Sequence, residues 1–161
     1  MAFASHLGPW LLGTVKNTTG TTAGTIRNMG ATVVSQANTL AYTDTSAKQM
    51  FVLPAGAQIL SFTVDATTAF NSGTNNVITI SDPSGNSLAT VTATSANITL
   101  GRATVAVTGA QIAEYVNVGS TDFIVSAVFA GTGTAATTGA ATITCQYVVR
   151  NSDGSANPAS A

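Results

Sequence analysis

Apolar and polar residues alternate along the middle of the chain in short runs, which is the spacing of half-buried β-strands. Three runs show it most clearly: QILSFTVD, DFIVSAVF and ATITCQYVV. The rows expected to face the core are Leu60, Phe62 and Val64 in the first, Phe123, Val125, Ala127 and Phe129 in the second, and Ile143, Cys145, Tyr147 and Val149 in the third. The second run is also apolar on its other side, as is typical of a central strand.

Weaker runs suggest further strands at 31–36, 49–53, 76–80, 96–100, 103–107 and 115–118. Turn residues separate the runs, as in Pro54-Ala-Gly and Asp82-Pro-Ser-Gly-Asn. Only residues 108–115 could form a helical turn, and that segment is too short to be stable alone. About eight or nine strands at roughly ten-residue spacing predict an all-β sandwich or barrel. Long connections favour a jelly-roll-like antiparallel β-sandwich over an immunoglobulin-like one.

The pattern divides the chain into three parts. Residues 1–30 are expected to be an extended N-terminal arm, 31–150 the β-sandwich domain, and 151–161 a flexible C-terminal tail. The first twelve residues lack the positive start and the unbroken apolar run of a secretory signal. No stretch is long and apolar enough to predict a membrane-spanning segment.

Composition narrows the possible partners. Only 7% of residues are charged and the net charge is −1, whereas about 25% charged residues is usual. Threonine, serine and asparagine therefore supply the polar surface. The five Lys and Arg residues are scattered, so no basic patch for nucleic acid or a membrane surface is expected. A net charge near zero favours association, which suggests a homo-oligomer.

The sequence offers little catalytic chemistry. The single histidine, His6, lies in the arm, and one His with one Cys cannot build a structural zinc site. Cys145 lies in a strand-like run and is expected to be buried and inert. We therefore expect a protein that is not an enzyme, with no catalytic residue, no metal and no cofactor. A glycosidase would need two carboxylates about 5–10 Å apart, and no pair is favoured by the sequence.

Two loops could have carried ligands. Asp82 and Asn86 could form part of a calcium loop, but a side chain capping backbone amides is the simpler role for Asp82. The loop from Asn71 to Asn76 is the candidate for carbohydrate binding. The aromatic residues mostly lie on or beside expected strands, where packing in the core is the default, whereas Trp10 lies outside any expected strand of the domain.

Residues 51–82, FVLPAGAQILSFTVDATTAFNSGTNNVITISD, resemble a recurring signature in virion proteins of tailed bacteriophages. That signature has a strand, a Leu-Pro-Ala-Gly turn, a strand of the form I-x-x-F-x-V, the phrase T-x-A-F-N-S-G-T and a strand of the form V-x-I. Residues 8–36, beginning GPWLLGTVKNTTG, resemble the N-terminal stretch of virion proteins from cyanophage-like phages.

This resemblance implies a small jelly-roll protein on the outer surface of the virion, made in the host cytoplasm. It implies a capsid decoration, or cement, protein that bridges major capsid proteins. The expected oligomer is a trimer, with a dimer as the second choice. The contact residues that we expect in the arm are Pro9, Trp10, Leu11, Leu12 and Arg27. The alternative is a tail or head-fibre module that binds host-surface carbohydrate.

Overall fold

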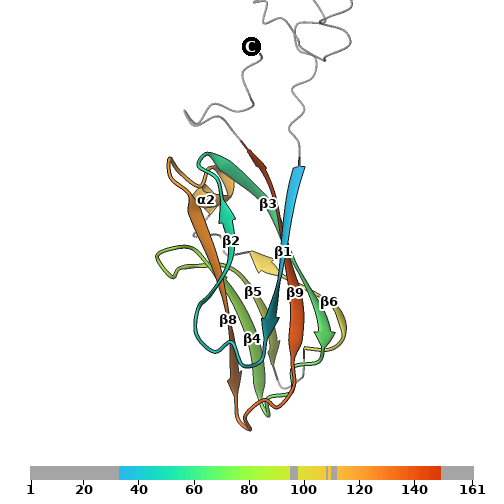
Figure 1. Ribbon diagram of the computed structural model, residues 1–161. Coiled ribbons are helices and arrows are strands. Elements are labelled where there is room, and N and C mark those ends of the chain that lie inside the picture. Colours follow the sequence, from blue (N-terminus) through green and yellow to red (C-terminus); the bar gives the residue numbers. More distant parts are fainter. Residues whose placement is uncertain (1–32, 95–97, 108, 110–111, 150–161) are drawn as a thin grey trace, which may run out of the picture.

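The protein forms two antiparallel β-sheets packed face to face in the computed structural model, which describes residues 33–94, 98–107, 109 and 112–149 (Figure 1). The first sheet has the order β1 (Val33–Ala41), β9 (Ala140–Val149), β3 (Ala57–Thr68) and β6 (Gly101–Ala103). The second has the order β2 (Lys48–Leu53), β8 (Phe123–Thr132), β4 (Asn75–Ser81), β5 (Ser87–Thr94) and β7 (Ala106–Val107). A short helix, α2 (Ile112–Val116), precedes β8.

The strand pairing is nested. β1 pairs with β9, β2 with β8, β3 with β6 and β4 with β5, so the chain folds back on itself as one long hairpin. The long hairpin is rolled into two sheets, which is the arrangement of a jelly roll. The expected all-β jelly-roll sandwich is therefore confirmed. The expected arm, residues 1–30, and the expected tail, residues 151–161, lie outside the described residues.

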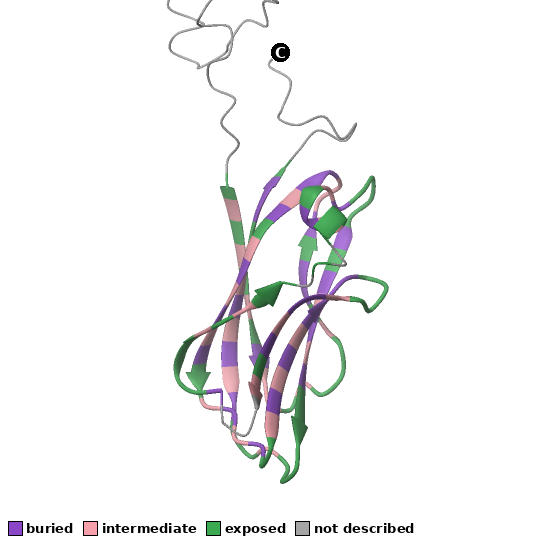
Figure 2. Cartoon of the chain, turned by 180° about the vertical axis from the view of Figure 1, so that it is seen from behind, coloured by how far each residue is buried: buried purple, intermediate pink, exposed green. Residues whose placement is uncertain are grey.

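The core lies between the sheets, where alternate residues of the longer strands β3, β4, β8 and β9 are buried (Figure 2). The row expected on β8 is buried in full, and Ile143, Cys145 and Tyr147 of β9 are buried as expected. Edge-to-face contact between Phe62 and Tyr115, whose ring centroids are 6.0 Å apart, adds to this packing.

Two apolar residues expected in the core lie outside it. The pairing of β3 with β9 shifts between Ile59 and Ser61, which marks a β-bulge. The bulge turns Ile59 into the core and leaves Leu60 44% exposed. At the end of β9, Val148 is buried while Val149 is exposed. Strict alternation predicts neither result, because a bulge or a strand end changes the face on which a residue lies.

Three strand expectations also need correction. β5 has no counterpart among the expected runs, because its small residues give a weak alternation. Of residues 96–100, Ile98 makes an isolated bridge to Phe70 and Leu100 is exposed, and residues 96 and 97 lie outside the described ones. The expected strand at 103–107 is split, its ends pairing as β6 and β7 in different sheets.

The expected strand at 115–118 is wrong. Tyr115 and Val116 belong to α2, and only Val118 makes a strand-like contact, donating its N–H to the carbonyl of Ala57. The Tyr115 hydroxyl donates to the carbonyl of Leu88 at 3.1 Å. This contact with the second sheet fixes the helical turn, which is too short to be stable by itself.

Candidate interaction surface

The described residues contain no group of three or more His, Cys, Asp or Glu side chains that could hold a metal ion. Cys145 is fully buried, and burial raises the pKa of its thiol to about 12, so it is protonated and unreactive at neutral pH. Within the part of the chain that the structure describes, no helix is long and apolar enough to cross a membrane.

Asp82 has the capping role expected from the sequence. It is 4% exposed, and its Oδ1 accepts hydrogen bonds from the backbone N–H groups of Ser84 and Asn86, both at 2.8 Å. Its Oδ2 accepts one from the Asn86 side chain, also at 2.8 Å. Burial alone would raise the pKa of Asp82, but these donors, together with a hydrogen bond from Glu114, hold it below the usual value.

Two of the three side-chain amides in the loop considered for carbohydrate binding, those of Asn71 and Asn76, form hydrogen bonds within the fold. Asn71 Oδ1 accepts from the N–H groups of Thr137 and Thr138, and Asn71 Nδ2 donates to the Thr137 hydroxyl. The side chain of Asn76 is fully buried, and its Oδ1 accepts from the backbone N–H and hydroxyl of Ser72. The bonds of Asn71 join the β3–β4 loop to the β8–β9 loop, and those of Asn76 hold the β3–β4 loop to the start of β4. Both stabilise that end of the sandwich.

The edge strands β1 and β2 are joined to each other by hydrogen bonds from side chains to backbone carbonyls, which makes the addition of a further strand unfavourable. Gln36 and Asn38 of β1 point inward and donate to the carbonyls of Val52 and Met50 on β2. In return, Lys48 donates to the carbonyl of Thr39. At the opposite edges, β6 has three residues and β7 has two. Short and side-chain-bonded edges are poor templates for strand addition, so the sheet faces are the better candidates for contact with another molecule.

The outer face of the four-stranded sheet is polar. Thr142, Thr144 and Gln146 of β9 lie on it, opposite Thr39, Ala37 and Ser35 of β1. It also carries a charged pair, because Arg102 donates from Nε and Nη2 to the two oxygens of Asp65 at 2.9 and 3.0 Å. Both side chains are well exposed, so the pair contributes little to stability.

The outer face of the five-stranded sheet has a different character. Val77 and Thr79 of β4 pair with Ala130 and Val128 of β8 on one side and with Thr92 and Thr90 of β5 on the other. Val52 of β2 and Ile124 of β8 pair with each other, and each is 40% exposed. We call these eight outward residues, Val52, Val77, Thr79, Thr90, Thr92, Ile124, Val128 and Ala130, the neutral face.

None of the described side chains on the neutral face is charged, and aliphatic groups alternate there with hydroxyls. The centres of protein–protein interfaces are depleted in charged residues in the same way. The sequence places five of these residues on expected strands, whereas Ala130 directly follows one, and Thr90 and Thr92 lie on β5, which has no counterpart among the expected runs. The sequence does not show that the eight adjoin one another. That requires the pairing of β4 with both β5 and β8.

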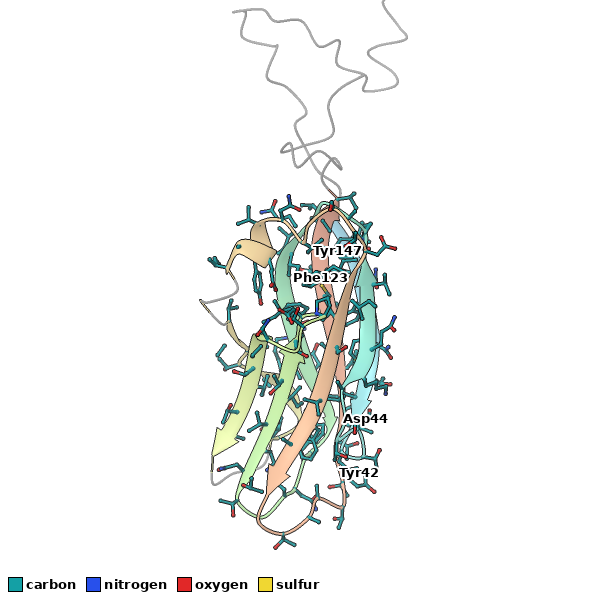
Figure 3. All side chains as sticks on the ribbon, turned by 90° about the vertical axis from the view of Figure 1, so that its left-hand side faces the viewer. Tyr42, Asp44, Phe123 and Tyr147 are labelled. Carbon is teal, nitrogen blue, oxygen red and sulfur yellow. The ribbon has the colours of Figure 1, made fainter. Side chains whose placement is uncertain are left out.

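Val33 and Val148 pair where β1 begins and β9 ends, so the chain continues from the same end of the sandwich in both directions (Figure 1). Tyr147 and Phe123 lie toward this end, and Tyr42 and Asp44 lie toward the other (Figure 3). The five contact residues expected in the arm lie outside the described residues: Pro9, Trp10, Leu11, Leu12 and Arg27.

No protein-family model matches this chain. No curated protein matches it either. Among solved structures, a chain of the capsid asymmetric unit of cyanophage Pam1 is similar, with a TM-score of 0.51 and 16% sequence identity. The match covers 82% of this chain and 95% of that one. At this identity, the likeness establishes a shared fold.

Proposed function

We propose that this chain is a non-enzymatic structural protein of a bacteriophage virion, attached to the outer surface of the capsid. The observation that carries the proposal is the fold: a jelly roll that matches 95% of a chain from a capsid asymmetric unit. The resemblance of residues 51–82 to phage virion proteins supports it independently. In this proposal the chain is a decoration protein that bridges major capsid proteins, as a homo-oligomer, with a trimer expected before a dimer.

The neutral face is the contact surface in this proposal. A neighbouring capsid subunit can cover it without removing any described charge from water, which would be costly. The four-stranded face would lose hydration of the Asp65–Arg102 pair if it were covered, so we assign it to solvent. The arm would add a second contact through Trp10 and its apolar neighbours. Each contact is modest, and many copies together would stabilise the shell.

A carbohydrate-binding fibre module is less well supported. Such a module uses exposed aromatic side chains or free amides. Among the described aromatic residues all are buried except Tyr42, which is partly exposed. The amides of Asn71 and Asn76 already bond within the fold.

The test is binding of purified protein to phage heads that lack it, measured by co-sedimentation. We expect the wild type to bind heads and Thr79→Lys to bind several-fold more weakly, because the lysine would have to be desolvated in the contact. Thr144→Lys is the matched control, since both threonines are half-buried and lie on inner strands, but on opposite outer faces. Thermal melting of each variant checks that it is folded.

Two results are informative in different ways. If the wild type does not bind heads but binds host polysaccharide, the proposed function is wrong. If the wild type binds heads and Thr144→Lys is the weaker variant, the function stands and the assignment of the face is wrong.

A further inference from the structure

Two carboxyl groups from different elements meet at the side of the sandwich next to α2. Asp82 belongs to the β4–β5 turn and is 4% exposed. Glu114 belongs to α2, and its Oε2 is inaccessible to solvent and has no hydrogen-bond donor among the described residues. Tyr115, next to Glu114, bonds to Leu88, which lies just after the turn that holds Asp82, so α2 lies beside that turn. Each carboxyl also shifts the pKa of the other, lowering that of Asp82 and raising that of Glu114. A buried carboxylate oxygen without a donor is costly, and a proton on Glu114 would remove that cost.

The two carboxyls differ in their partners. Asp82 accepts three hydrogen bonds within its own turn, which favour its charged form. Glu114 has no comparable donors, and burial, followed by the charge of Asp82 and a hydrogen bond to it, raises the pKa of Glu114. When the pair holds a single proton, that proton is therefore bound to Glu114, and the resulting O–H group donates a hydrogen bond to the Asp82 carboxylate.

No described cation neutralises the pair. Lys48 and Arg102 are bonded to Asp44 and Asp65. On α2 itself the other titratable group is Tyr115, which is neutral and donates to Leu88. Asp122, between α2 and β8, is exposed. From β3, packed against the helix, the only titratable side chain is Asp65, already paired with Arg102.

We propose that Glu114 and Asp82 form a proton-dependent clamp that holds α2 against the β4–β5 turn. With the proton in place, Glu114 donates to Asp82 and the pair carries one negative charge. When the proton leaves for solvent, two like charges remain close together in a partly buried place and repel each other, so α2 is held less tightly against the turn. Tyr115 keeps its bond to Leu88, so the opening is local and the sandwich stays folded.

The direction of the pH effect follows because α2 is held against the β4–β5 turn when Glu114 is protonated. The clamp is closed at pH values below the usual carboxyl range and opens as the pH rises through the raised pKa of Glu114. Opening changes the surface around Ile112 and Val116, which are exposed on α2. The clamp does not depend on the proposed function.

The test is amide hydrogen exchange of α2 in the full chain from below the ordinary glutamate pKa of 4.5 up to about pH 8, corrected for the intrinsic pH dependence of exchange. We expect protection of α2 in the wild type to fall several-fold across this range, while β8 and β9 stay protected. Glu114→Gln has a permanent N–H donor for Asp82, so its α2 should keep its protection throughout. Asp122→Asn, a carboxyl change at an exposed position, should behave like the wild type.

A carboxyl NMR titration gives a second readout. A wild-type α2 whose protection does not change with pH, a Glu114→Gln protein with the wild-type pH dependence, or a Glu114 carboxyl that titrates at its usual value would each overturn the proposal.

Discussion

Single residues in the loops stabilise each end of the sandwich. Asn71 and Asn76 bond within their own end of the fold, and Asp82 caps the β4–β5 turn. Side chains of these types also occur in ligand sites, so their identity does not settle their role. Here their hydrogen bonds are made within the fold, by Asp82 in its own turn, by Asn76 to the adjoining β3–β4 loop and by Asn71 to the β8–β9 loop, and their contribution is to stability.

Gly139 gives a prediction at this scale. It has φ of 150°, and a Cβ built there would lie 2.3 Å from Cδ1 of Phe70, whose ring packs on Phe129 with centroids 4.8 Å apart. We expect Gly139→Ala to lower the free energy of unfolding by about 1–3 kcal/mol, the usual cost of overpacking. Urea unfolding measures this.

Gly109→Ala is the matched control for that substitution. A Cβ at Gly109 would have no atom of the described residues within 4 Å, so this change should alter the unfolding free energy little. Equal effects of the two substitutions would show that the Phe70 contact does not limit residue 139.

At the scale of elements, bulges and turns decide which side chains reach the core. The bulge in β3 exchanges Ile59 and Leu60 between the two faces. The β1–β2 turn is held by Asp44, whose Oδ2 accepts from the N–H of Ala41 and from Lys48 Nζ, both at 2.9 Å. The carbonyl of Asp44 in turn accepts from the N–H of Phe129 on β8. This one turn therefore connects β1, β2 and β8.

The Asp44 turn predicts a pH dependence. The backbone hydrogen bond from Ala41, then the side chain of Lys48, lower the pKa of Asp44 from its ordinary value of 3.8. A lowered pKa means that the stabilisation is present above pH 3.8 and is lost as the pH falls through the folded-state value. We expect Asp44→Asn to be less stable than the wild type at pH 7, by about 1 kcal/mol.

Thermal melting of both proteins from pH 7 to pH 2 measures this. The difference between them should shrink toward the acid end, because the wild type then loses the charge that the variant never has. A difference that stays constant over the range would mean that Asp44 acts through its shape rather than its charge.

At the scale of the whole molecule, the fold has closed edges and two unlike outer faces. One face carries hydroxyls and the Asp65–Arg102 pair, and the neutral face carries no described charge. β1 begins and β9 ends at the same end of the sandwich. In the proposed function, the neutral face and the arm are two separate contacts with the capsid, and they can be removed one at a time.

Deletion of residues 1–12 removes Pro9, Trp10, Leu11 and Leu12 but none of the described strands. We expect the truncated protein to have the melting temperature of the wild type and to bind heads more weakly. Burial of large apolar side chains such as these contributes about 1.5–3 kcal/mol each before the cost of ordering the arm. Co-sedimentation with heads and thermal melting check the two parts of this prediction. Loss of folding would show instead that the first residues belong to the domain.

Much of the fold follows from local pattern. The inward rows of β8 and of most of β9 are read directly from alternation, because a buried strand face must be apolar. β5, the bulge at Ile59 and the helix at Tyr115 do not follow from pattern. Each depends on a partner distant in the sequence, such as Leu88 for Tyr115, and a local pattern contains no information about that partner.

The sequence by itself determined an all-β sandwich with little charge, a buried Cys145 and a capping role for Asp82, because strand periodicity and turn chemistry are local properties. Only the tertiary structure decided which residues adjoin. Nested pairing brings Thr79 beside Val128 and Thr90 to form the neutral face. The packing of α2 brings Glu114 to Asp82 across an interval of many residues. Contacts of this kind follow from strand order and register, which are set by the packing of the whole chain.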